Sequence, residues 1–232
     1  MNTNTTLETP LWERYLREGF SFPVPTSTYI PQVSSEKTPH LIWLMEPEEK
    51  HNGRWILLGG RAKARKPGRM SSSGVRLLPS FQTPMQCLRA EFTEEAGGAG
   101  ATMISPKLWA IKCDPNSGLR KTTLGKLTHN TCPEPLRNVP VFGHYGVPDS
   151  IFTGGVKGTP HPNDGEAKGF FKYDVRKVEV TASEQESKFG ANHDLIVAVY
   201  RLELAGCQIN KAEAFSDLTK LRRTLPKLLA AL

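Results

Sequence analysis

The sequence predicts an α/β protein, and three observations support that fold class. Apolar runs of strand length occur at residues 40–45, 54–58 and 107–112. A capped amphipathic helix is predicted over residues 83–97. With 232 residues, the chain is long enough to bury one substantial core.

No clear domain boundary divides this chain. We expect residues 39–232 to form a single domain that ends in a helical segment, preceded by an N-terminal extension of residues 1–38. Within the extension, residues 22–32 carry three prolines and are expected to be extended.

The composition indicates the cellular compartment and the kind of partner. No run of about 18 apolar residues is present, so we expect no membrane-spanning helix. The N-terminus lacks the basic and apolar segments of a signal peptide, which predicts a cytoplasmic protein. The four cysteines lie far apart without a CxxC pair, a pattern that does not favour zinc. A net charge of +7 serves solubility and also favours phosphates, nucleotides or nucleic acid as partners.

Before the helix, the pattern alternates between strands and a basic stretch. The runs at 40–45 and 54–58 flank a polar turn and could pair as a hairpin. The second run is closed by Gly59 and Gly60. Residues 61–78 are rich in Arg, Lys, Ser and Gly, contain no acid and show no periodicity, so we expect a loop.

The helix at 83–97 has signals at both ends. Thr83 is a good N-cap, Pro84 suits the first helical position, and Gln86 completes a capping box. Glycines at 97–98 favour its end. One apolar stripe is formed by Met85, Leu88, Phe92 and Ala96.

The second half of the chain is less regular. We expect strands at 107–112, 139–147 and 169–175, with a Gly/Pro-rich loop at 149–165. Residues 194–204 fit a helix or a strand. Ser216 is expected to cap a final helix that Pro226 kinks or restarts, with an inward face of Leu218, Leu221, Leu225 and Leu228.

Three carboxylates share one face of the predicted helix. Glu91, Glu94 and Glu95 stand at positions i, i+3 and i+4, so they repel one another. Bound Mg²⁺ or Mn²⁺ would offset that repulsion, because both ions prefer carboxylate oxygens, water and substrate phosphates. An ordinary solvated acidic face is the alternative.

The segment RAEFTEEAGG at 89–98 resembles the core of the Nudix box, G-x5-E-x7-R-E-U-x-E-E-x-G-U. Glu91 matches the Glu of the Arg-Glu pair, and Glu94 and Glu95 match the double Glu. The preceding strand with Gly59 and Gly60 is similar to the family's lead-in. Later, DGEAKGFFKYDV resembles the family's acidic loop before an aromatic strand, which places Glu166 in that loop.

The box also departs from the family pattern. Gln82 stands at the first Glu, and Ala90 at the Arg. Arg89 is one residue early, and one residue turns a helix by about 100°. The departures leave a catalytically weak nucleotide-binding or regulatory module as an alternative to an enzyme.

The resemblance implies an α/β/α sandwich around a mixed sheet, with long loop insertions. It implies hydrolysis of a pyrophosphate bond in a nucleoside diphosphate derivative, with a slight preference for a nucleotide sugar such as ADP-ribose. Glu91, Glu94 and Glu95 would serve Mg²⁺ or Mn²⁺, with Glu166 as a candidate general base. Substrate contacts are expected at Gly59, Gly60 and Arg61. A further alternative is RNA 5′-end processing through the basic loop 61–76, and a homodimer is left open.

Overall fold

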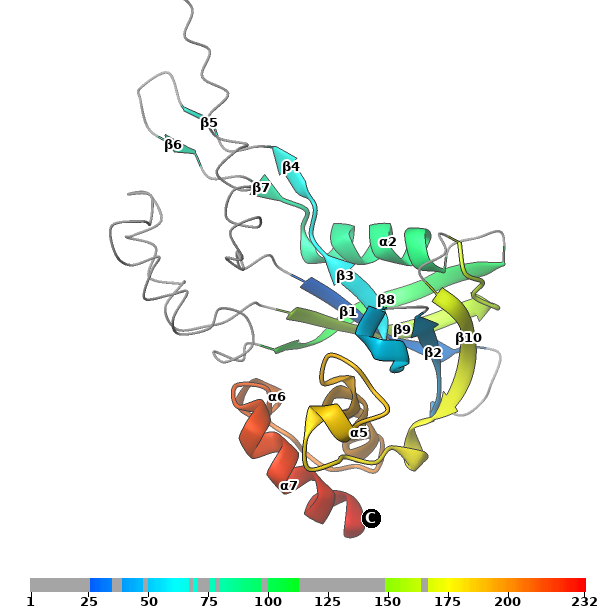
Figure 1. The fold of residues 1–232 in the computed structure, drawn as a ribbon, viewed down its shortest axis with the longest axis vertical. Helices are drawn as coiled ribbons and strands as arrows, with labels where there is room; N and C mark the ends of the chain where they lie inside the picture. Colours follow the sequence, from blue (N-terminus) through cyan, green and yellow to red (C-terminus); the bar gives the residue numbers. More distant parts are fainter. Residues whose placement is uncertain are drawn as a thin grey trace, which may run out of the picture.

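The computed structural model describes residues 26–34, 39–47, 50–66, 69–70, 76–77, 80–96, 100–112, 149–163 and 167–232. In Figure 1, these residues form three layers, with helix α2 on one face of a sheet and helices α5 to α7 on the other. The expected α/β/α sandwich around a mixed sheet is confirmed.

The main sheet has six strands. Five follow the order β10–β2–β1–β9–β8, and β3 pairs with β1 beside β2. The β1–β9 pair is parallel and the other pairs are antiparallel, which makes the sheet mixed. The strands are β1 (Thr26–Val33), β2 (Leu41–Pro47), β3 (Leu58–Arg61), β8 (Ala101–Lys112), β9 (Asp149–Gly158) and β10 (Ala167–Asp174).

Shorter elements surround the sheet. Two small antiparallel ribbons precede α2, one pairing β4 with β7 and the other β5 with β6. The elements are η1 (Lys50–Gly53), β4 (Ala64–Lys66), β5 (Arg69–Met70), β6 (Arg76–Leu77), β7 (Ser80–Phe81), η3 (Val175–Lys177) and η4 (Glu184–Glu186). The stretch 61–78, expected to be a loop, therefore contains short strands.

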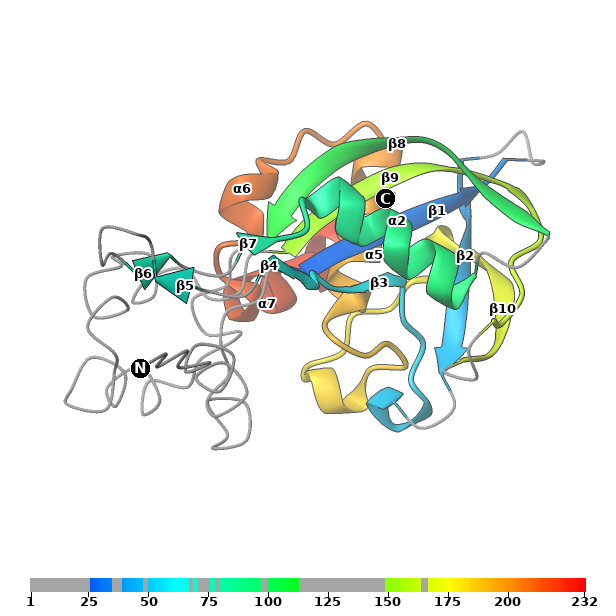
Figure 2. The ribbon, with the colours of Figure 1, turned by 90° about the horizontal axis from the view of Figure 1, so that it is seen from above.

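The helices are α2 (Pro84–Glu95), α5 (His193–Leu204), α6 (Lys211–Ala214) and α7 (Leu218–Ala230). Figure 2 shows α2 lying across the sheet. Successive β1 side chains enter opposite cores, because strand side chains alternate. Tyr29 packs with Leu88 and Phe92 of α2, whereas Ile30 packs in the core beneath α5 and α7.

Several predicted elements are confirmed. The α2 helix begins after Thr83 as expected. Strand β8 contains the run predicted at 107–112, and β2 and β10 contain all but one residue of the runs predicted at 40–45 and 169–175. The ambiguous segment 194–204 is helical. The expected hairpin is reduced to one antiparallel bridge, Met45↔Ile56, after which the chain continues into β3 beside β1.

Two strands differ from the expectation. Residues 26–33 fall within the expected extension 1–38, yet they form β1 in the interior of the sheet, so the sheet takes in chain well before residue 39. The predicted loop 149–165 is wrong over Asp149–Gly158, which form β9 between β1 and β8. In both cases, neighbouring strands on each side supply the hydrogen bonds that hold the segment extended.

The final helix also differs in detail. Asp217, rather than Ser216, is the N-cap, and its side chain accepts a hydrogen bond from the Lys220 amide. Leu218, Leu221 and Leu225 are buried as expected, but Leu228 is 49% exposed. Pro226 lies inside α7 and does not end it.

Some predictions lie outside the described residues, namely the strand at 139–147 and the helix-ending glycines at 97–98. Among the helices that the structure describes, none combines the length and apolar character needed to cross a membrane.

Candidate metal-binding site

Helix α2 is fixed at its start and along its apolar face. The Gln86 amide donates to Thr83 Oγ1 at 3.3 Å, and the Thr83 amide donates to Gln86 Oε1 at 3.1 Å. These reciprocal bonds form the predicted capping box. Leu88 and Phe92 are buried against the sheet. The acidic residues in the last turns of α2 are therefore held close to β1 and β3.

Glu95 is the most deeply placed of the three carboxylates, with 5% of its surface exposed. Its Oε2 accepts a hydrogen bond from the Gly59 amide at 3.1 Å. A buried carboxylate needs such partners, because removing its water costs several kcal/mol. The bond fastens the last turn of α2 to the start of β3.

Glu91 lies against the next residue of β3. A Cβ added to Gly60 would stand 2.2 Å from Glu91 Oε2 and 2.4 Å from its carboxyl carbon. Gly60 therefore leaves the space that the carboxylate occupies. The two adjacent glycines each lie against one glutamate of α2, so the structure brings the Gly-Gly pair and the acidic helix together.

Glu94 points to a different partner. Its Oε1 forms an ion pair with Lys63 Nζ, and the two side chains are 45% and 55% exposed. The hydrogen bond to Glu94 raises the pKa of Lys63, and the charges of Glu94 and Glu91 raise it further. The positively charged ammonium of Lys63 thus lies against the acidic face of α2.

The donor set suits a hard divalent cation, since it consists of carboxylate oxygens on one helix face. Gly60 leaves room for Glu91, and an ammonium group already lies on Glu94, as a cation would. Among the described residues, no three His, Cys, Asp or Glu side chains are gathered closely enough to hold a metal. Glu95 faces the Gly59 amide and Glu94 faces Lys63, so metal binding requires at least Glu94 to turn.

The candidate general base Glu166 lies outside the described residues, as does Asp164. The residues that flank it are described. Asn163 Nδ2 donates to the Thr93 carbonyl at 3.2 Å, which ties this part of the chain to α2 beside Glu94. Ala167 is buried where β10 begins. The sequence reading did not single out Asn163, because a lone Asn in a polar segment carries no local signal.

Arg61 was predicted to contact the substrate. Arg61 ends β3 directly after Gly60 and is exposed. From the basic stretch, it is Lys63 that contacts the acidic face. Arg89, one residue early for the Nudix pattern, is exposed, and its carbonyl accepts a bond from Thr93 Oγ1 at 2.8 Å.

Cys87 lies next to the acidic face but has the properties of a packing residue. It is fully buried, and its Sγ lies 3.6 Å from the Gly60 carbonyl. Burial raises the pKa of its thiol to about 11. The thiol therefore stays neutral at physiological pH and is a poor nucleophile.

The segment that leads into β3 is also held in place from the opposite face of the sheet. His193, at the start of α5, accepts the Leu57 amide on Nδ1 at 2.9 Å. An acceptor Nδ1 is unprotonated. Leu57 stands two residues before Gly59, so this bond helps to fix the strand that meets Glu95.

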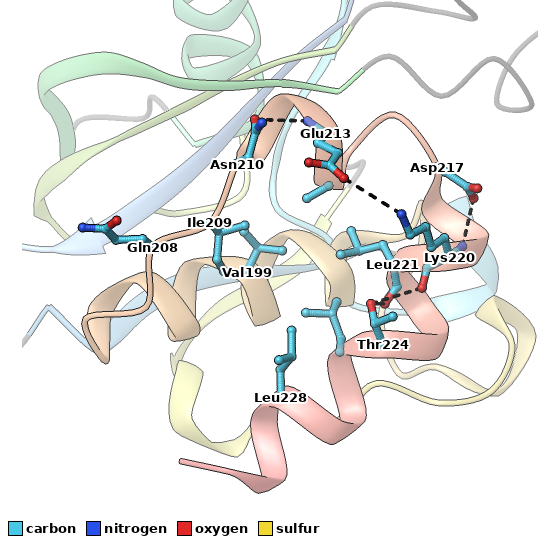
Figure 3. Close-up of a pocket in the computed structure, with 12 residues that line it drawn as sticks. Val199, Gln208, Ile209, Asn210, Glu213, Asp217, Lys220, Leu221, Thr224 and Leu228 are labelled. Atoms are coloured by element: carbon cyan, nitrogen blue, oxygen red, sulfur yellow. Dashed lines mark hydrogen bonds and ion pairs between the residues drawn. The ribbon is translucent and has the colours of Figure 1, made fainter.

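A pocket lies away from the acidic helix, between α5, α6 and α7 (Figure 3). Its volume is about 280 Å³. Val199, Leu221 and Leu225 contribute apolar lining, and the Glu213–Lys220 ion pair at 3.9 Å lies at its edge. None of the predicted site residues lines it.

Comparison with known proteins gives distant structural similarity only. No family model matches the chain, and no curated protein matches it. It is similar to a putative Nudix hydrolase from Chromobacterium violaceum, at 15% identity and TM-score 0.45, over 91% of this chain and 99% of that one. A NUDIX hydrolase from Nitrosomonas europaea gives 14% and 0.45, over 79% and 73%.

The NUDIX domain of Shewanella oneidensis NrtR, solved with ADP ribose, gives 9% identity and TM-score 0.40, over 83% of this chain and 97% of that one. TM-scores below 0.5 carry no argument about activity. The function has to be argued from the chain's own residues.

Proposed function

We propose that this protein is a hydrolase that depends on Mg²⁺ or Mn²⁺ and cleaves a pyrophosphate bond in a nucleoside diphosphate derivative. One observation carries the proposal: Glu91 and Glu95 lie against the adjacent glycines of β3, while Glu94 pairs with the ammonium of Lys63. The Nudix resemblance of residues 89–98 adds the reaction class. We further propose that the chain from β1 onward is one cytoplasmic domain.

The three glutamates take separate roles in this proposal. Glu94 and Glu95 hold the metal, and Glu91 is a further ligand or a base for water. A bound divalent ion neutralises diphosphate charge and lowers the pKa of an attacking water. The hydrogen bond of Glu95 to Gly59 fixes one ligand in advance, whereas Glu94 is exposed and would leave Lys63 to reach the metal.

Glu166 is proposed as the general base. It stands three residues after Asn163, whose side chain is bonded to the α2 backbone at Thr93. That bond holds the preceding chain beside the turn that carries Glu94 and Glu95. The proposed base is therefore close in sequence to a residue that contacts α2.

The substrate side is proposed to lie at Gly59, Gly60 and Arg61. Glycine allows a phosphate to approach the backbone closely, and Arg61 is exposed at the end of β3. The net charge of +7 favours a substrate with two phosphates. A nucleotide sugar such as ADP-ribose is the proposed substrate class.

The test is product release from a panel of nucleotides, nucleotide sugars and capped or triphosphorylated RNA, with Mg²⁺ or Mn²⁺. Wild type is compared with Glu94→Gln and Glu95→Gln, and Glu213→Gln on α6 controls for the loss of one exposed carboxylate. We expect the first two variants to lose at least about 100-fold in turnover, as metal ligands do, and the control to match wild type.

Ala90 at the family's Arg position and the ion pair of Glu94 with Lys63 favour a second candidate, a nucleotide-binding module without efficient catalysis. The same panel separates the two. Tight ligand binding without turnover on any substrate supports the binding module. Turnover on RNA alone, with steep salt dependence, instead supports the RNA-processing alternative.

A further inference from the structure

Lys63 forms an ion pair with Glu94, and hydrogen bonds fix the Lys63 backbone beside α2. The Lys63 amide donates to Gln82 Oε1 at 3.0 Å, and the Gln82 amide donates to the Lys63 carbonyl at 3.0 Å. Gln82 immediately precedes the Thr83 cap of α2. Lys63 is thus attached to the start of the helix whose last turn it contacts.

The ammonium group and a divalent ion would compete for the same carboxylate. Lys63 Nζ lies on Glu94 Oε1, and a metal bound through Glu94 would bring two positive charges against it. The lysine has a flexible four-carbon stem, and its side chain is 55% exposed. Metal binding would therefore displace the ammonium by repulsion without unfolding its backbone attachment.

We propose that Lys63 is a phosphate-binding residue that Glu94 holds while the metal site is empty and releases when metal enters. Once released, the ammonium would be available to the phosphate oxygens of a diphosphate ligand bound at the metal. This inference rests on the proposed metal-dependent function. It adds a substrate contact and a reason why metal and diphosphate bind cooperatively.

The experiment measures two affinities by calorimetry, that of Mn²⁺ alone and that of methylenediphosphonate with saturating Mn²⁺. Lys63→Met removes the charge and keeps the length. Without its competitor, Mn²⁺ should bind about two- to fivefold more tightly, the range of an exposed ion pair. Methylenediphosphonate should bind about tenfold more weakly, because a charged hydrogen bond to phosphate is lost.

Opposite signs distinguish this role from a structural one, which would weaken both affinities. Lys227→Met on α7 is the matched control for loss of one exposed charge, and Lys63→Arg should stay close to wild type in both measurements. Equal Mn²⁺ and diphosphonate affinities in Lys63→Met and Lys227→Met would overturn the inference alone, provided Glu94→Gln still weakens Mn²⁺ binding. Wild type that binds no Mn²⁺ would overturn the proposed function as well.

Discussion

Gly59 and Gly60 are adjacent, and a side chain added at each would meet a different kind of neighbour. Gly59 has φ +147°, and an added Cβ would lie 2.1 Å from the Ser27 backbone oxygen. An added Cβ at Gly60 would instead meet the end of the Glu91 side chain. Backbone cannot move aside cheaply, whereas a carboxylate can swing away.

We therefore predict that one of the two substitutions lowers mainly stability and the other mainly metal affinity. Gly59→Ala should lower the free energy of unfolding by about 2–4 kcal/mol, through strain and clash. Gly60→Ala should change it by less than about 1 kcal/mol but weaken Mn²⁺ binding roughly tenfold, by one displaced ligand. Urea unfolding and calorimetry measure the two quantities. Equal stability losses would show that Gly60 serves the fold rather than Glu91.

Cys87 gives a pH prediction. Its thiol has a pKa raised by burial to about 11 in the folded protein, against 9.0 for an ordinary thiol. Between these values the unfolded chain loses a proton that the folded chain keeps, so stability falls as pH rises from about 9 to 11.

Cys87→Ala should remove part of that fall, of order 1 kcal/mol. The measurement is urea unfolding of both proteins between pH 8 and 10, before the buried tyrosines titrate. Burial also raises the pKa of Tyr173, to about 12, so alkaline loss above this window is shared. Parallel stability curves for the two proteins would contradict the assignment.

At the scale of elements, α5 and α7 are joined by a buried ion pair. Arg222 donates to Asp194 Oδ2 at 2.6 Å and to Oδ1 at 2.9 Å, and the Asp194 side chain is fully buried. The guanidinium also donates to Asn192 Oδ1 and to the Thr181 carbonyl. The pair is thus fully hydrogen-bonded, and removing one partner would leave a buried charge alone.

Arg222→Met should lower the free energy of unfolding by about 3–5 kcal/mol, the cost of an unpaired buried charge. Arg223→Met, at the exposed neighbouring position, is the control and should change it by less than about 0.5 kcal/mol. Chemical denaturation measures both variants. A small loss in Arg222→Met would mean that water or another group reaches Asp194.

The β8–β9 pair fixes the two ends of the segment between them. Lys112 and Asp149 are direct antiparallel partners, and their side chains form a buried ion pair at 3.2 Å. Thr28 Oγ1 of β1 donates to the same carboxylate. The strands are therefore positioned to be joined by a short turn.

Replacing residues 113–148 with Asn-Gly, a two-residue hairpin turn, should preserve the fold. Shortening the connection lowers the entropic cost of closing it, so the free energy of unfolding should stay the same or rise, by up to about 2 kcal/mol. Circular dichroism and thermal unfolding provide the check. An unfolded or aggregated product would show that the replaced segment contributes to the core.

For the whole molecule, an element could be predicted from the sequence when its signals lie within a few neighbouring residues. Helix α2 was predicted closely because Thr83, Pro84 and Gln86 carry its start within four residues. Strand β9 was missed because its glycines resemble a loop. Gly154 is required there since an added Cβ would lie 2.8 Å from the Ile104 backbone oxygen of β8. That approach exists only after the sheet has formed.

The site divides in the same way. The three glutamates and the two glycines could be singled out from the sequence because helical spacing and a short motif mark them. The sequence reading did not anticipate the Lys63–Glu94 pair or the Asn163–Thr93 bond, which join residues 31 and 70 positions apart. These contacts arise when distant parts of the chain pack together. No periodic pattern in a single sequence indicates them.

Hydrolysis of ADP-ribose in ¹⁸O-labelled water with Mn²⁺ tests the central claim most directly. Water attack at the diphosphate breaks one P–O bond, so the account predicts AMP and ribose 5-phosphate with one ¹⁸O in a single phosphate product. Glu95→Gln should abolish both products. Substrate that stays intact with wild type across the nucleotide panel, or products without label on phosphorus, would contradict the claim that α2 supports pyrophosphate hydrolysis.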